Sequence, residues 1–336
     1  MKVRLAVLII VVIVLGAYVV ARHAGGNTVV DRAAPITTSV GRTIGYGSVG
    51  LQTNTAVHSI PLDQVLDGGP GKDGIPALTN PAFVSQDAAN GFLSGDKRGI
   101  KVTVGQTTRF YPFNIMVWHE VVNDIIEGKH LVVTFCPLCG SSIVFDATVD
   151  GKTETFGVSG KLYESNLLMY DKETESLWSQ IQGTAVAGDK TGTKLTLYPS
   201  QVISFAELRA QYPDAVVLSE NTGYKRDYTL YPYGDYTTNN NLYFPISIHD
   251  NRLSAKEIMY VVSYGTHSLA FRLSELTSST ATLSADGAEV TAKKVGGEVE
   301  VRDSAGKVIP GFYTMWFAWA IYHQKDGIVW TAGKQL

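Results

Sequence analysis

From Gly99 onward the chain consists of short apolar runs separated by turns, and this pattern limits the possible folds more than any other feature. The runs include IKVTV, HLVVTF, IVFDATV, TETFGV, LLMYD and KLTLYP, and EGK, DGK, DKETES and GDKTGT separate some of them. Short runs rich in Val, Ile, Thr, Tyr and Phe between Gly- and Asp-containing turns are typical of strands in antiparallel sheets. We therefore expect a mainly β (β-rich α+β) fold, a single sandwich-like antiparallel meander with few short helices.

Two segments interrupt this pattern. Residues 203–213, ISFAELRAQYP, place Phe205, Leu208 and Tyr212 at helical spacing before a proline, so we predict one short helix there. Residues 114–126, NIMVWHEVVNDII, fit either a helix or a strand. The EGK turn and the VVTF run that follow favour a hairpin, and we predict a strand.

The N-terminus predicts contact with a membrane. Lys2 and Arg4 precede seventeen uncharged residues, 5–21. A signal peptide has a shorter apolar stretch, of about 7–15 residues, and a spanning helix needs roughly 17–25. The length favours an uncleaved signal anchor, with a cleaved signal peptide as the alternative. The two basic residues would stay in the cytoplasm, which places the rest of the chain outside it.

The remaining organisation follows from composition. We expect a signal anchor or signal peptide over residues 1–23. Residues 24–56 are rich in Gly, Ser and Thr and predict a flexible linker, and residues 57–336 predict an extracytoplasmic β-rich domain.

The charge balance bears on possible partners. The chain has 28 Lys and Arg against 31 Asp and Glu, a net charge of −3, and no dense basic tract follows the N-terminus. Nucleic acid binding relies on clustered basic residues that neutralise phosphates, so we expect no nucleic acid partner. The expected partners are the membrane, through the N-terminal helix, and a small molecule or an envelope component.

Several longer stretches resemble an uncharacterised bacterial and archaeal family, the domain-of-unknown-function family 3179 (DUF3179). They occur in the family's order between residues 68 and 323: GGPGKDGIPALTNPAFV, WHEVVND, VTFCPLCGSSIVFD, FGVSGKLYESNLLMYDKETESLWSQ, TGYKRDY and MWFAWAIYH. The resemblance implies little about activity, because this family has no assigned reaction.

The segment FCPLCG holds the only two cysteines of the chain, Cys136 and Cys139. The first interpretation is a catalytic redox dithiol. In thioredoxin-like proteins the first cysteine of such a motif lies at a helix N-terminus, which lowers its pKa. Here GSSIVFDATVDGK follows and predicts a strand and a turn, so a redox pair would need another scaffold.

The second interpretation is a metal site. A Cys-Pro-x-Cys-Gly segment can direct two thiolates to one ion, but a structural zinc site normally has four protein ligands. His119 is the leading candidate for a third ligand, followed by Glu120, Asp146, Met169 and His249. Two thiolates with an imidazole would suit copper or zinc.

The third interpretation is a structural disulfide. Such a bond would close a very small loop, so its entropic stabilisation would be small, although an extracytoplasmic location favours oxidation. Elsewhere, Arg226 and Asp227 lie between tyrosines in TGYKRDY, where they could bind an anion or a carbohydrate or form a solvated loop. The loop around Lys72 and Asp73 is a second candidate surface.

The sequence thus leaves two functions open. The first is a membrane-tethered extracytoplasmic protein with a redox or metal site at the cysteine pair. If this protein is an enzyme, it is expected to be an oxidoreductase. The alternative is a non-catalytic envelope module that binds a small molecule or a partner and contains a structural disulfide.

Overall fold

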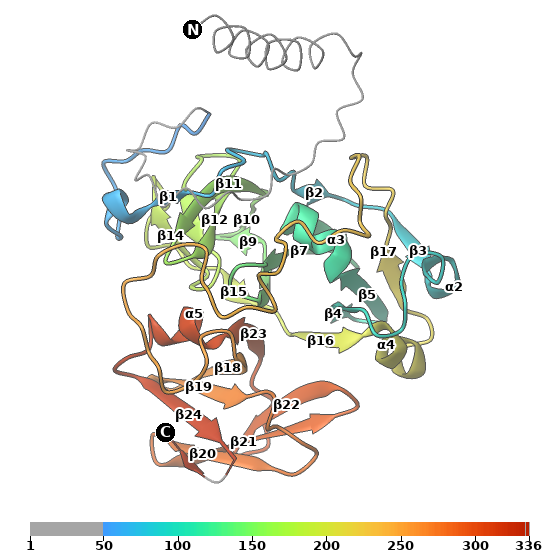
Figure 1. The fold of residues 1–336 in the computed structure, drawn as a ribbon, viewed down its shortest axis with the longest axis vertical. Helices are drawn as coiled ribbons and strands as arrows, with labels where there is room; N and C mark the ends of the chain where they lie inside the picture. The colour runs from blue at the N-terminus through green and yellow to red at the C-terminus, as the bar shows by residue number, and fades with distance from the viewer. Residues whose placement is uncertain (1–49, 333, 336) are drawn as a thin grey trace, which may run out of the picture. The chain divides into compact units, whose positions relative to one another are not determined.

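The computed structural model describes residues 50–332, 334 and 335, and strands make up most of their regular structure (Figure 1). The prediction of a mainly β fold is confirmed. Within these residues no helix is long and apolar enough to cross a membrane. The predicted anchor or signal peptide at residues 1–23 lies outside the described residues. From Gln52 the chain contacts the domain, since Gln52 N and Thr53 Oγ1 donate hydrogen bonds to Glu175.

The largest sheet in the described part of the chain has ten strands. In spatial order they are β2 (Leu78–Thr79), β6 (Val121–Ile126), β7 (Lys129–Cys136), β8 (Ser141–Asp146), β23 (Gly311–Met315), β18 (Ile258–Tyr264), β19 (His267–Arg272), β24 (Gly327–Thr331) and β25 (Lys334–Gln335), and β15 (Thr196–Leu197) also pairs with β8. The consecutive strands β6, β7 and β8 form the expected antiparallel meander. The pairs β2–β6 and β19–β24 are parallel, so the sheet as a whole is mixed.

A second sheet lies beside the cysteine segment in the fold. Its strands, in order, are β1 (Leu66–Asp67), β11 (Phe156–Tyr163), β12 (Asn166–Asp171), β13 (Leu177–Ser179) and β14 (Thr184–Ala187). Strands β9 (Thr148–Val149) and β10 (Lys152–Thr153) form a separate two-stranded ribbon. The principal hydrophobic core joins side chains of β6, β7, β8, β11 and β12 and includes both cysteines.

Two further sheets complete the described strands. One has the order β16 (Ser200–Ser204), β4 (Arg98–Val104), β5 (Thr107–Pro112), β17 (Val216–Leu218) and β3 (Phe83–Ser85). The other is the meander β20 (Ala281–Ala285), β21 (Ala288–Val295) and β22 (Glu298–Asp303). Two short helical segments, η1 (Leu62–Gln64) and α2 (Gln86–Ala89), lie in the connections.

The helix expected within residues 203–213 is confirmed as α4 (Phe205–Gln211). Its start is fixed by a capping box, in which the Ser204 hydroxyl accepts from the backbone N–H of Glu207 and the Glu207 carboxylate accepts from that of Ser204. The last helix, α5 (Trp316–Ala320), is buried along its whole length.

The strand predicted over residues 114–126 is wrong in its first half. Residues Phe113–His119 form helix α3, and only the second half forms strand β6. Pro112 precedes the helix with a φ of −68°, which suits a helix start, and Glu120 ends it with a φ of 57°. This left-handed residue turns the chain from the helix into β6, so that His119 and Glu120 lie at the junction of the two elements.

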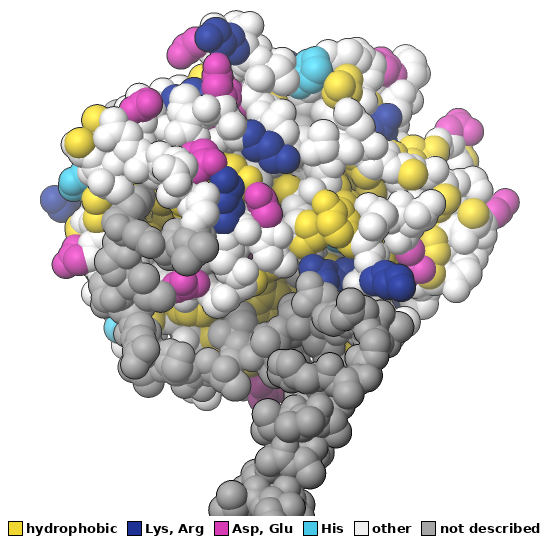
Figure 2. Space-filling view, turned by 90° about the horizontal axis from the view of Figure 1, so that it is seen from above, with side chains coloured by type: hydrophobic (Ala, Val, Ile, Leu, Met, Phe, Trp, Pro, Cys, Tyr) yellow, Lys and Arg dark blue, Asp and Glu magenta, His cyan; other side chains and the backbone are white. Residues whose placement is uncertain are grey.

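Charged side chains of both signs are interspersed on the face shown in Figure 2, around clusters of hydrophobic side chains that reach the surface. Lys and Arg side chains border the largest of these visible clusters. This face therefore combines apolar surface with nearby positive charge.

Candidate functional site

The two cysteines lie in the turn that joins β7 to β8. Cys139 N donates to Cys136 O at 3.2 Å, and Gly140 follows in the left-handed region, with a φ of +56°. A Cβ atom at Gly140 would lie 3.2 Å from the Met315 side chain, so both the conformation and the space favour glycine. This turn brings the two sulfur atoms to 3.4 Å from each other. Both cysteines are free thiols, and their exposed fractions are 1% for Cys136 and 0% for Cys139.

A buried network of polar side chains surrounds Cys139. Its thiol donates to the backbone carbonyl of Ser165 at 3.1 Å, and Asn166 Nδ2 donates to its sulfur at 3.4 Å. Asn166 Nδ2 also donates to Gln180 Oε1 at 2.9 Å, and Gln180 Nε2 donates to the Thr134 hydroxyl at 2.9 Å. Burying polar groups is costly unless each is paired. Here the hydrogen bonds fix the Cys139 sulfur from two sides.

The backbone beside this sulfur adopts an unusual conformation. Glu164 and Ser165 form the two-residue link of the β11–β12 hairpin, and their φ values are 51° and 59°. Such links normally contain Gly or Asn, because other side chains are strained there. The Ser165 hydroxyl is also buried without a hydrogen-bond partner among the described residues. Strain of this kind is concentrated at functional sites in proteins.

Glu120 places a buried carboxyl group near the thiols. The Tyr233 hydroxyl donates to Glu120 Oε1 at 2.6 Å, and burial raises the pKa of Glu120 from 4.5 to about 7. Burial and the neighbouring Cys136 raise the pKa of the Cys139 thiol well above its ordinary value, and the charge of Glu120 raises it further. The Tyr236 hydroxyl donates to the carbonyl of Leu138, within the cysteine turn, at 2.7 Å.

Both ring nitrogens of His119 form hydrogen bonds within the protein. Its Nδ1 lies 2.8 Å from the Pro76 carbonyl and its Nε2 lies 2.7 Å from the Tyr228 hydroxyl, so Nδ1 donates and Nε2 accepts. Burial lowers the pKa of His119 to about 4, and the imidazole is neutral at pH 7. Met169 is buried in β12 and His249 is exposed. Among the described residues, no three His, Cys, Asp or Glu side chains are grouped so that they could hold a metal ion.

A comparison with protein families identifies the chain. The family model described as "Protein of unknown function (DUF3179)" matches residues 72–305, which is more than half of the 336 residues. The chain belongs to the DUF3179 family. No curated protein and no solved structure matches it. The matched region of this DUF3179 chain contains the cysteine turn, Glu120 and the whole network around Cys139.

Asp146, a candidate metal ligand, is at the far end of the β7–β8 hairpin from the cysteines. It pairs across the hairpin with Leu131, whereas Cys136 pairs with Ser141 next to the turn. Its carboxylate forms an ion pair with Lys129. The DUF3179 fold therefore does not bring Asp146 to the cysteine pair.

The candidate binding residues Arg226 and Asp227 contact groups within their own loop and in neighbouring segments. Arg226 lies over the ring of Trp118, 5.8 Å from its centroid, and donates to the Gly74 carbonyl at 3.5 Å. Asp227 accepts from the backbone and the hydroxyl of Thr229, at 3.1 and 2.5 Å. These contacts order the loop.

The second candidate surface is also held by internal contacts. Lys72 forms an ion pair with Glu175 at 2.5 Å, and the Tyr170 hydroxyl donates to the Asp73 carboxylate at 2.6 Å. In this DUF3179 protein both side chains of the loop are used to fasten it to the sheet of β11 and β12.

Six contributors to the site were not among the predicted residues: Ser165, Asn166, Gln180, Tyr233, Thr134 and Tyr236. One signal could have pointed to the first two, because a two-residue link between apolar runs, Glu164-Ser165, lacks the expected Gly or Asn. Gln180 and Tyr233 are brought in by tertiary pairing, which leaves no local pattern.

Proposed function

We propose that Cys136 and Cys139 form a dithiol–disulfide redox centre, and that the protein is an oxidoreductase held outside the cytoplasm by its N-terminal segment. The observation that supports this most directly is the 3.4 Å separation of two free thiols within one tight turn. A disulfide has an S–S distance of about 2.05 Å, so closure requires the sulfurs to approach by about 1.4 Å.

The proposed reaction is a thiol–disulfide exchange with an acceptor disulfide. Because Cys136 is only 1% exposed, the cysteine turn must first open. The Cys136 sulfur then attacks one sulfur of the acceptor, the acceptor S–S bond breaks, and the first acceptor thiol leaves. The Cys139 sulfur then attacks Cys136 in the mixed disulfide and releases the second acceptor thiol. The two electrons and two protons of the protein dithiol leave on the two acceptor thiols, so no other reactant is needed.

The surroundings of Cys139 suit the second, intramolecular step. Its raised pKa makes it a poor nucleophile toward an external disulfide, while the hydrogen bonds from Asn166 and to Ser165 keep its sulfur beside Cys136. Glu120, with a pKa of about 7, can gain or release a proton close to neutral pH. A group with such a pKa is suited to accept the Cys139 proton as the disulfide forms.

The test is a redox titration of the full-length chain in mild detergent. The protein is equilibrated in dithiothreitol buffers of graded potential, quenched with acid, and unfolded in urea with a maleimide so that the buried free thiols are trapped and counted by mass. We expect both thiols to disappear together in one two-electron transition, in which a tenfold change in the equilibrium constant corresponds to about 30 mV. The control variants Cys136→Ser and Cys139→Ser should each keep one trappable thiol throughout.

Two results would overturn the proposal. One is a pair of thiols that stays reduced, or a disulfide that stays intact, across the whole range of buffers. The other is a transition metal bound to the native protein and lost in Cys136→Ser, which native mass spectrometry of the same sample would reveal. A disulfide, by contrast, makes the chain about two daltons lighter through the loss of two hydrogens.

A further inference from the structure

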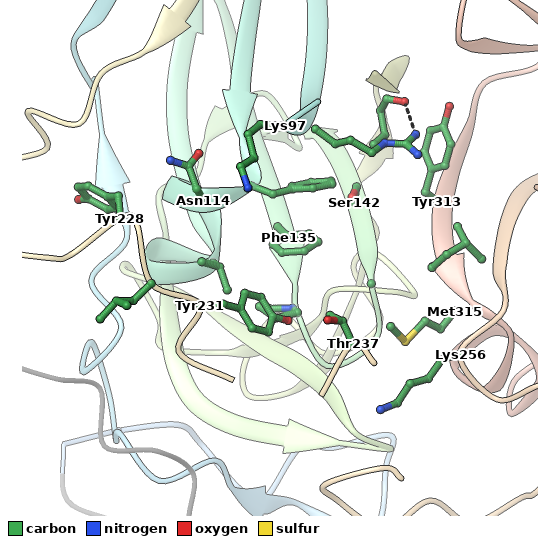
Figure 3. Close-up of a pocket in the computed structure, with 18 of the residues that line it drawn as sticks. Lys97, Asn114, Phe135, Ser142, Tyr228, Tyr231, Thr237, Lys256, Tyr313 and Met315 are labelled. Carbon is green, nitrogen blue, oxygen red and sulfur yellow. Dashed lines mark hydrogen bonds between the residues drawn. The ribbon is translucent and has the colours of Figure 1, made fainter. Parts of the chain in front are cut away.

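A cavity of about 760 Å³ lies against the cysteine turn (Figure 3). Pro137 and Gly140 of the turn line it, together with Phe135 at the end of β7. Its other walls come from the start of β4, from α3, from the segment of residues 228–237 and from β18 and β23. Cavities of about 300–1,000 Å³ are the usual size for sites that bind small organic molecules.

The middle of the cavity is apolar and aromatic. Phe113 and Phe135 stack with their ring centroids 4.3 Å apart and their planes 18° apart, and both line the cavity. Val117, Ile258 and Met315 add aliphatic surface. A flat or branched hydrocarbon body would be well desolvated against these side chains.

The charged side chains of the lining are all basic. They are Lys97, Arg98 and Lys256, and neither Asp nor Glu lines the cavity. Figure 3 shows Lys97 and Lys256 on opposite sides of Phe135. Among the described residues none of the three forms an ion pair with a carboxylate. The charges of Asp96 and Asp235 act on Lys97 and Lys256 from outside the lining, so the lining itself stays purely basic.

Lys256 is the best placed of these cations. Its Nζ donates to the Tyr236 carbonyl at 2.5 Å and to Asn239 Oδ1 at 3.3 Å, and it lies 3.4 Å from the centroid of the Tyr236 ring. An ammonium group has three donors, so a ligand would compete with this ring for the third. It is partly buried, whereas Lys97 and Arg98 are exposed. Water screens a partly buried charge less, so its attraction for an anion is stronger.

Two polar atoms of the lining lack partners. Asn114 Oδ1 and Ser142 Oγ are buried without a hydrogen bond among the described residues, and Ser142 is only 2% exposed. Nearly all buried polar groups in folded proteins have a hydrogen-bond partner, because an unpaired one is costly. Both atoms are closed off from solvent as the cavity stands, so they mark polar positions in its wall rather than open contacts.

We propose that this cavity binds a small organic anion, with an apolar aromatic or branched body against Phe113 and Phe135 and a carboxylate-type head group at Lys256. The site is defined by the cavity, its apolar middle and its basic lining, and it does not depend on the redox chemistry proposed for the neighbouring cysteines.

The test compares two probes of the same shape by isothermal titration calorimetry on the full-length chain in mild detergent, with a detergent blank. The probes are 2-naphthoate, an anion, and 2-naphthamide, its neutral counterpart. We expect saturable binding of one 2-naphthoate per chain, at least about tenfold tighter than 2-naphthamide, because a charge-assisted hydrogen bond in a desolvated site is worth more than a neutral one.

Variants assign the preference to a residue. Lys256→Met should weaken 2-naphthoate binding about tenfold and leave 2-naphthamide unchanged, and Lys256→Arg should keep the preference, which controls for a folding defect. The exposed Lys172 lies outside the cavity, so Lys172→Met should change neither affinity. The proposal is overturned if wild-type protein binds neither probe, if it binds both equally, or if Lys256→Met weakens both probes alike.

Discussion

Replacing Glu120 with Gln should make the protein more stable above neutral pH, and the size of the effect follows from its environment. Burial raises the pKa of Glu120 from 4.5 to about 7 in the folded protein. Between these two pH values the folded state holds a proton that the unfolded state has lost, so the free energy of unfolding falls as pH rises. Each pKa unit corresponds to about 1.4 kcal/mol, which gives a cost of about 3 kcal/mol above pH 7.

The Glu120→Gln variant removes this cost without removing the hydrogen bond. The amide oxygen of Gln can still accept from the Tyr233 hydroxyl, which lies 2.6 Å from Glu120 Oε1. We expect the variant to equal wild type near pH 4, where the carboxyl is neutral in both states. At pH 8 it should exceed wild type by about 3 kcal/mol.

Urea unfolding of the full-length chain in mild detergent, with the thiols kept reduced, measures this difference at each pH. The exposed Glu289 on β21 provides the matched control, because Glu289→Gln removes the same charge from a solvated position. A difference between Glu120→Gln and wild type that does not change from pH 4 to pH 8 would refute the reasoning. So would a variant that is less stable than wild type at pH 8.

Three further predictions concern the same region. In a Glu120→Gln background, His119 should contribute about 3 kcal/mol to the rise in stability from pH 4 to 6.5, because burial lowers its pKa from 6.5 to about 4 and the unfolded state binds the extra proton. Adding His119→Gln should reduce the rise measured by urea unfolding by that amount, and an unchanged rise would contradict the assignment. Ser165→Gly should stabilise the protein by about 1 kcal/mol, because glycine tolerates the φ of 59° and the change removes an unpaired buried hydroxyl. A lower urea midpoint for this variant would contradict strain at residue 165. Iodoacetamide should alkylate Cys136 and Cys139 on the order of 100-fold more slowly in the folded reduced protein than in urea, because both sulfurs are buried. Mass spectrometry measures the two rates, and equal rates would show that the turn opens freely.

The parts of the fold that could be predicted from the sequence are those encoded by local patterns. The β6–β7–β8 meander follows from short apolar runs with turns between them, and α4 follows from its helical spacing and its capping residues. Helix α3 was missed because Ile115, Met116, Val117 and Trp118 are all buried, so the segment has no polar face to reveal a helical period. Pro112 is a local signal for its start, whereas no local pattern marks its end at the left-handed Glu120.

The candidate site also has a part that the local sequence predicts and a part that only tertiary packing brings together. Cys136 and Cys139 are three residues apart, and a turn was enough to predict that they meet. The partners of Cys139 are the Ser165 carbonyl in the β11–β12 link and Asn166 at the start of β12, and Gln180, which binds Asn166, follows β13. These strands lie in a different sheet from the cysteine turn, and no periodicity in the sequence indicates the contact. The expectation that His119 would complete a metal site assumed a strand, and the end of a buried helix instead directs both ring nitrogens to Pro76 and Tyr228.

The energetics of the site argue that the surroundings of Cys139 are more than packing. Asn166 and Gln180 are almost fully buried amides, and a hydrophobic pair of similar volume would fill the same space without the cost of desolvation. Ser165 adds backbone strain and an unpaired hydroxyl in the same place. These unfavourable contributions lie around one sulfur atom, which Asn166 and the Ser165 carbonyl contact directly and which lies 3.4 Å from a second one. A plain structural turn needs neither the buried amides nor the strain, whereas a thiol pair that must alternate between two bonding states needs a scaffold that fixes the sulfur in both.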